Sequence, residues 1–65
     1  MYRTVRPTQP VEVERDGSWY AGELQAWRTD DDGAWLAFVL YGVAPGMRYL
    51  DWVSANRVRQ PATGE

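Results

Sequence analysis

The 65-residue chain contains no cysteine, no histidine and no lysine. Without cysteine there are no disulfide bonds, and without cysteine and histidine the usual zinc sites are excluded as well. No apolar run reaches the roughly 18 residues that a membrane-spanning helix needs, and residues 1–7 lack the apolar stretch of a signal peptide. We therefore expect a cytoplasmic protein that holds no metal and no other cofactor.

The residues that most often carry out catalysis are also scarce. General acid–base catalysis near neutral pH usually relies on histidine, and covalent catalysis uses an activated serine, cysteine, lysine or carboxylate. Ser18 and Ser54 have no evident base partner, and the acidic run 30–32 is followed at once by Gly33, which favours a solvated turn over paired catalytic carboxylates. The sequence therefore predicts a protein that is not an enzyme.

A chain of this length is one small domain, which buries only about 60% of the surface that its unfolded form exposes. Its stability must come from its four tryptophans, four tyrosines and one phenylalanine, or from a partner. The net charge of −2 favours basic partners and does not fit the basic stripe of a non-specific nucleic-acid binder. All seven positive charges are arginines, however, and four of them could share one face: Arg6, Arg48, Arg57 and Arg59.

The pattern along the chain is that of a small all-β barrel with four to five strands. Pro7 and Pro10 indicate an extended, loosely attached leader over residues 1–10, and residues 61–65 resemble a flexible tail. Between them, residues 11–60 form the predicted barrel, which we expect to close on itself. Its strands are expected at 11–15, 18–29, 34–41, 47–53 and 57–59, with a turn at 16–17, a turn at 30–33, a loop at 42–46 and a 3₁₀ turn at 54–56.

Alternation along a strand assigns its residues to two faces. In the strand 18–29 the better core face carries Tyr20, Gly22, Leu24 and Ala26, and Gly22 is the expected site of a bulge or bend. In the strand 34–41 both faces are apolar. We therefore expect an exposed apolar patch that invites a partner or a second copy, unless the leader or the tail folds over it. The patch would consist of Trp19, Trp27, Leu36 and Phe38.

Two segments resemble the Tudor, Agenet and chromo-barrel group of SH3-like barrels. One is Val39-Leu40-Tyr41, and the other runs from Asp51 and Trp52 to Arg57 and Val58. In chromo barrels a strand that ends in His-Tyr precedes a motif close to Trp-Asp-Glu-Trp-Val, which is followed by an Arg-Val or Arg-Ile pair. The segment 16–24 is similar to the Tudor hairpin. The resemblance implies an SH3-like barrel of the Tudor or chromo type, with a short 3₁₀ turn before its last strand.

In that group an aromatic cage at one end of the barrel holds a methylated lysine or arginine, because ring faces attract a partly dehydrated cation. By position, the resemblance assigns cage roles to Tyr20, Tyr41 and Tyr49, and Asp51 would stand at the rim. Val43 or Ala44, and Val13, stand where the group has its other cage aromatics, so the cage would be incomplete. The structural alternative is that these tyrosines pack the barrel and its mouth.

Three functions stay open on this basis. The first is a non-catalytic module that binds a protein or peptide, through the mouth tyrosines or the apolar patch. The second is an accessory factor associated with nucleic acid, since aromatic side chains can stack on bases. The third is a structural unit that associates with itself, as a homodimer formed through Trp19, Trp27 and Phe38.

Overall fold

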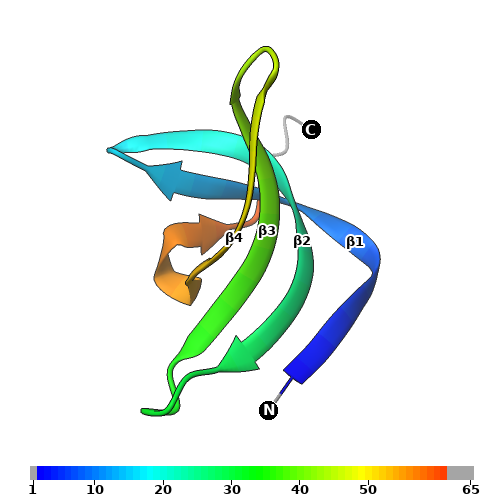
Figure 1. Cartoon of the computed structure of the whole chain (residues 1–65), viewed down its shortest axis with the longest axis vertical. Coiled ribbons are helices and arrows are strands. Elements are labelled where there is room, and N and C mark those ends of the chain that lie inside the picture. Colours follow the sequence, from blue (N-terminus) through cyan, green and yellow to red (C-terminus); the bar gives the residue numbers. More distant parts are fainter. Residues whose placement is uncertain (1, 62–65) are drawn as a thin grey trace.

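The computed structural model describes residues 2–61, which form one antiparallel sheet in the strand order β4-β3-β2-β1-β5. The sheet curls into a half-barrel whose two edges are β4 and β5, so the predicted all-β fold is confirmed (Figure 1). A 3₁₀ turn, η1, directly precedes β5, as expected. The elements are β1 (Tyr2–Arg15), β2 (Ser18–Thr29), β3 (Trp35–Ala44), β4 (Met47–Ser54), η1 (Ala55–Arg57) and β5 (Val58–Arg59).

The turns follow from local side-chain chemistry. Asp16 and Gly17 connect β1 to β2, and both have positive φ angles, 53° and 83°, as a two-residue hairpin turn requires. At the β2–β3 connection, Oδ1 of Asp30 accepts hydrogen bonds from the backbone N–H groups of Asp32 and Ala34, each at 2.9 Å. The acidic run is therefore a turn, as predicted. The predicted loop at 42–46 is shorter than expected, because β3 continues to Ala44 and β4 begins at Met47.

The prediction that the ordered structure starts at Val11 is wrong, because β1 already begins at Tyr2. Residues 2–4 pair with the end of β2, the pairing is interrupted over residues 5–8, and it resumes at Gln9. Both prolines fit this strand. Pro7 lies in the interruption, and at Pro10 the side of β1 away from β2 has no partner strand among the described residues, where β5 pairs only with Glu12 and Val13. Residues 62–65 of the predicted tail lie outside the described part of the chain.

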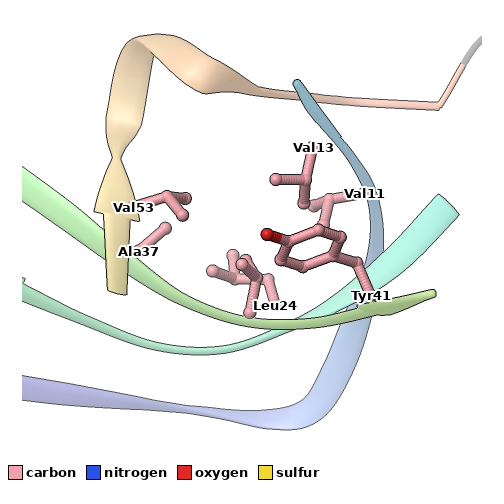
Figure 2. Packing of buried hydrophobic residues seen from close by; sticks show 7 residues of the cluster. Val11, Val13, Leu24, Ala37, Tyr41 and Val53 are labelled. Carbon is pink, nitrogen blue, oxygen red and sulfur yellow. The ribbon is translucent and has the colours of Figure 1, made fainter. Parts of the chain in front are cut away.

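The core lies on the concave side of the sheet, which we call the inner face; the convex side is the outer face. Figure 2 shows valines of β1 and β4 facing Leu24 and Tyr41 across this interior. Val13 and Val39 are fully buried at its centre, and Tyr20 packs against it while half-buried. The buried core residues are Val11, Val13, Leu24, Ala37, Val39, Tyr41 and Val53.

A bulge in β2 exchanges its two faces. Leu24 pairs with Val39, but the next pair is Ala26 with Phe38, so Gln25 is the additional residue. Beyond Gln25 the parity changes: Ala26 is buried outside the core cluster, opposite Phe38, and Trp27 turns to the inner face, opposite Ala37. Ala26 is buried as predicted, but on the side of the sheet opposite to Leu24, and the predicted outer position of Trp27 is wrong.

The irregularity was expected at Gly22, where the pairing is regular. Glycine is needed there because β2 and β3 approach too closely for any side chain. A Cβ at position 22 would lie 2.6 Å from the carbonyl oxygen of Leu40 and 2.7 Å from Cβ of Tyr41. Both atoms are fixed by the β3 backbone, so the contact cannot be relieved by moving a flexible side chain.

We predict that Gly22→Ala destabilises the protein by about 1–3 kcal/mol, the usual cost of overpacking. Gly42→Ala is the matched control, because a Cβ at that position would have its nearest neighbours at 3.7 Å, an ordinary contact. Chemical denaturation of the two variants measures both values. Equal stabilities of the two variants would contradict the proposed close approach of β2 and β3.

Candidate functional site

Two of the three predicted cage tyrosines meet at one end of the half-barrel. Tyr41 of β3 pairs with Tyr49 of β4, and their ring centroids are 5.7 Å apart. Tyr41 is only 3% exposed, whereas Tyr49 is half-buried. Tyr20 is also half-buried on the inner face, opposite Val13, but within residues 2–61 its ring has no aromatic contact with the other two. The mouth of the half-barrel is therefore a pair of rings rather than a cage of three.

A cation of the protein itself occupies this pair. Nη1 of Arg15 donates a hydrogen bond of 2.9 Å to the Tyr41 hydroxyl, and the guanidinium carbon lies 4.2 Å from the Tyr49 ring centroid. Arg15 reaches this position because it is the last residue of β1, directly before the tight turn. The place where an aromatic cage would hold an external cation is filled by Arg15, in the geometry that ring faces and guanidinium groups favour.

The surroundings of Arg15 favour its charged form further. The hydrogen bond to Tyr41 is the largest cause that raises the pKa of Arg15 above its ordinary value, and the Asp16 carboxylate, 3.9 Å away, also contributes. Arginine is protonated throughout the physiological pH range, so the interaction is fully present there. It is lost only as the pH rises through the strongly alkaline range.

Asp51, the predicted rim residue, lies on β4 opposite Val39 and remains exposed. Its Oδ1 accepts a hydrogen bond of 2.8 Å from the backbone N–H of Trp52. Asp51 forms no ion pair with Arg48 in the described structure, because residues three apart on a strand point to opposite faces. Asp51 instead lines a polar cleft of about 330 Å³ at the opening between β1 and β4, together with Arg15, Asp16, Tyr41, Trp52, Val53, Ser54 and Arg57.

The predicted four-residue apolar patch does not exist as a unit. Leu36 and Phe38 do lie on the outer face of β3, but Trp27 is on the inner face. Trp19 lies in β2 next to the first turn, beneath the Arg59 guanidinium at 3.9 Å from its ring centroid. The four side chains therefore belong to three separate surroundings.

A different apolar surface, the outer patch, contains Leu36 and Phe38. The ring of Trp52 lies 4.7 Å from that of Phe38 and 6.0 Å from that of Tyr2, and the Arg28 guanidinium covers Trp52 at 4.7 Å. Tyr2 comes from the predicted leader, so the leader contributes one ring to this patch and contacts Trp52. The members of the outer patch are Tyr2, Leu36, Phe38, Leu40, Leu50 and Trp52.

Sequence reasoning missed several of these residues. The predicted apolar patch did not include Leu40, Leu50 or Trp52. A signal was available for them: on two adjacent strands, positions 36, 38 and 40 and positions 50 and 52 alternate in phase. Tyr2 had no such signal, because its strand was expected to be a loose leader.

The described residues offer aromatic, polar and ionic groups for contact. Within residues 2–61 no group of three or more histidine, cysteine or acidic side chains is placed to hold a metal ion. The described part of the chain also contains no helix that is long and apolar enough to cross a membrane. Comparison of the chain with protein-family models, curated proteins and solved structures gives no match.

We predict that Arg15→Gln opens the mouth to an external cation. Tetramethylammonium should then shift the ring resonances of Tyr41 and Tyr49 in a saturable manner, with several-fold tighter binding than to the unmodified protein, because the competing guanidinium is gone. Titration followed by NMR measures the two affinities. Arg59→Gln, which removes a guanidinium stacked on Trp19 on the outer face, should leave the affinity unchanged. Equal binding to all three proteins would rule out Arg15 as the group that occupies the mouth.

Proposed function

We propose that the protein is a non-catalytic binding module that recognises another protein or a peptide through exposed aromatic surface, carried on an SH3-like barrel of the Tudor or chromo type. Three features support this type of barrel. The five antiparallel strands curl into a half-barrel, and a 3₁₀ turn directly precedes the last strand. The segment from Asp51 to Val58, which carries the resemblance, runs from the second half of β4 through η1 to the first residue of β5.

The outer patch is the observation that carries the proposal. Tyr2 and Leu50 are 63% and 55% exposed, and the other four members are only half-buried. A continuous apolar surface of this kind on a small domain marks a site of interaction. Its aromatic rings are already held by one another and by Arg28, so a partner that packs on them immobilises few additional torsions.

In this proposal the mouth supplies polar contacts to the partner. With Arg15 stacked on Tyr49, a partner at this end meets a guanidinium and the carboxylates of Asp16 and Asp51 rather than bare rings. Recognition of a methylated cation at the mouth would require Arg15 to leave. We therefore assign the main apolar contact to the outer patch and polar rim contacts to the mouth.

Two arginines that nucleic-acid binding would need are engaged elsewhere. Nε of Arg57 lies 3.3 Å from a carboxylate oxygen of Glu14, and the same side chain donates a hydrogen bond to the Glu14 carbonyl at 3.0 Å. Arg59 contacts the Glu12 carboxylate at 2.7 Å. Both arginines thus hold η1 and β5 against β1, so these two positive charges are already paired with carboxylates rather than available to phosphates.

Leu50→Asp tests the outer patch. The residue is exposed, so the variant should fold, and a carboxylate at the patch should weaken partner capture from cells of the native host by at least about tenfold. Met47→Asp is the matched control: Met47 is 50% exposed on the same strand, three residues away, and therefore on the other face. Quantitative mass spectrometry of captured proteins compares the two. Loss of the same partners from both variants, or from neither, would refute the assignment.

Self-association is a second candidate, favoured by the edge strand β4. Eight residues of β4 pair with β3 on one side only, and they include neither proline nor lysine, the residues that commonly protect an edge. Sedimentation velocity at increasing concentration decides between the candidates. A stable homodimer that Leu50→Asp dissociates would favour self-association, and a monomer at the highest concentration would exclude it and leave the partner-binding proposal intact.

A further inference from the structure

The β2–β3 turn lies at the end of the half-barrel away from the β3–β4 turn (Figure 1). A second aromatic pair lies beside it. Trp27 of β2 and Trp35 of β3 have ring centroids 6.2 Å apart and planes at 90°. They border an open pocket of about 370 Å³, within the usual size range of small-molecule sites. Arg3 of β1 and Ala55 of η1 complete its lining.

The strand registers explain how these residues meet. Arg3 pairs with Trp27 across β1 and β2, and Trp27 pairs with Ala37 on β3. The bulge at Gln25 is what turns Trp27 to the inner face, where the Trp35 ring meets it at a right angle. Trp35 remains 44% exposed, so the corner between the two indoles is accessible to a ligand.

Arg3 differs from the three arginines whose guanidinium groups cover aromatic rings. Within residues 2–61 its guanidinium has no hydrogen bond, ion pair or stacked ring, whereas Arg15, Arg28 and Arg59 each cover a ring. The pocket cannot satisfy it, because an indole ring offers a hydrogen-bond donor and no acceptor. The acidic side chains of the neighbouring turn do not line the pocket, and Oδ1 of Asp30 already accepts two backbone hydrogen bonds. Arg3 is exposed, so water hydrates its guanidinium in the free protein. A ligand that brings an anionic acceptor to the pocket would replace this water with charge-assisted hydrogen bonds.

We propose that this pocket binds an aromatic carboxylate, with the ring in the corner between Trp27 and Trp35 and the carboxylate on Arg3. The indoles supply edge and face contacts for an aromatic group, and a guanidinium binds a carboxylate through two parallel hydrogen bonds. The same chemistry is presented by a free aromatic acid and by the C-terminal aromatic residue of a peptide. The site shares no residue with the outer patch, so it stands independently of the proposed function.

The charge requirement is tested with three probes that share a benzyl group: N-acetyl-phenylalanine, its amide, and benzyltrimethylammonium. NMR titration, read at the indole N–H resonances of Trp27 and Trp35, should show that the acid binds about tenfold more tightly than the amide, because the charge-assisted hydrogen bonds are lost. Benzyltrimethylammonium should bind most weakly. Equal affinities of the acid and the amide, or tightest binding of the cation, would overturn the proposal.

Variants locate the site. Arg3→Gln should reduce the affinity for the acid to that for the amide and leave the amide itself unaffected, while Trp35→Leu should weaken both probes. Arg48→Gln is the matched control, since Arg48 is an exposed arginine of β4 that also has no hydrogen bond or ion pair within residues 2–61. An unchanged affinity of Arg3→Gln for the acid, in a variant whose spectrum shows the native fold, would also overturn the proposal.

A third comparison separates the two sources of ligand. If the tripeptide Gly-Gly-Phe with a free C-terminus binds more tightly than N-acetyl-phenylalanine, its additional backbone contributes and the site takes peptide C-termini. If N-acetyl-phenylalanine binds equally or more tightly, the site takes a free aromatic acid. Both results support the shared chemistry, and failure of both ligands to bind would refute it.

Discussion

The curvature of the β2–β3 pair is the constraint on which the other features of this structure depend. The two strands approach so closely at Gly22 that no Cβ fits, and three residues later the bulge at Gln25 adds twist and exchanges the faces of β2. The inner face therefore carries Leu24 before the bulge and Trp27 after it. One strand in this way supplies the core, the end pocket and, through Ala26, the support beneath the outer patch.

Arginine side chains cover aromatic rings that a larger core would bury in a longer chain. A small domain leaves many aromatic rings near the surface, and in this protein three such rings are covered by guanidinium groups, those of Arg15, Arg28 and Arg59. Lysine would serve this purpose less well, because a planar guanidinium stacks on a ring and still donates hydrogen bonds at its edge. Arg15 shows both contacts at once, on Tyr49 and on the Tyr41 hydroxyl.

Much of the fold could be predicted from the sequence because the turns and strands follow from the preferences of neighbouring residues. Asp16-Gly17 and the acidic turn end strands wherever they occur, and the predicted bounds of the strand 18–29 agree with β2. The faces beyond Gln25 could not be predicted, since nothing in the residue itself distinguishes a bulge from a regular position. The strand over residues 2–10 was missed because prolines normally exclude a strand. Here Pro7 lies where the pairing with β2 is interrupted, and Pro10 has no partner strand on its other side within residues 2–61.

The candidate site was predictable in its residue types but not in its partners. Tyr41 and Tyr49 were expected at the mouth, yet Arg15 lies 26 residues from Tyr41 in the chain, and only the curl of the sheet brings the two together. The end pocket combines Arg3 with two tryptophans from other strands in the same way. Residue identity suggested aromatic recognition, and the registers decided which arginine would meet which ring.

The two ends of the half-barrel therefore have the same kinds of side chain, but the arginine has a hydrogen-bond partner at one end only. Each has a pair of aromatic rings and an arginine from β1, but at the mouth one ring carries a hydroxyl that accepts a hydrogen bond, so the guanidinium is satisfied within the protein. At the other end both rings are indoles, which cannot accept, and Arg3 has no hydrogen-bond partner in the described structure. The difference between a phenol and an indole thus separates a filled end from one that is complementary to an acceptor brought by a ligand.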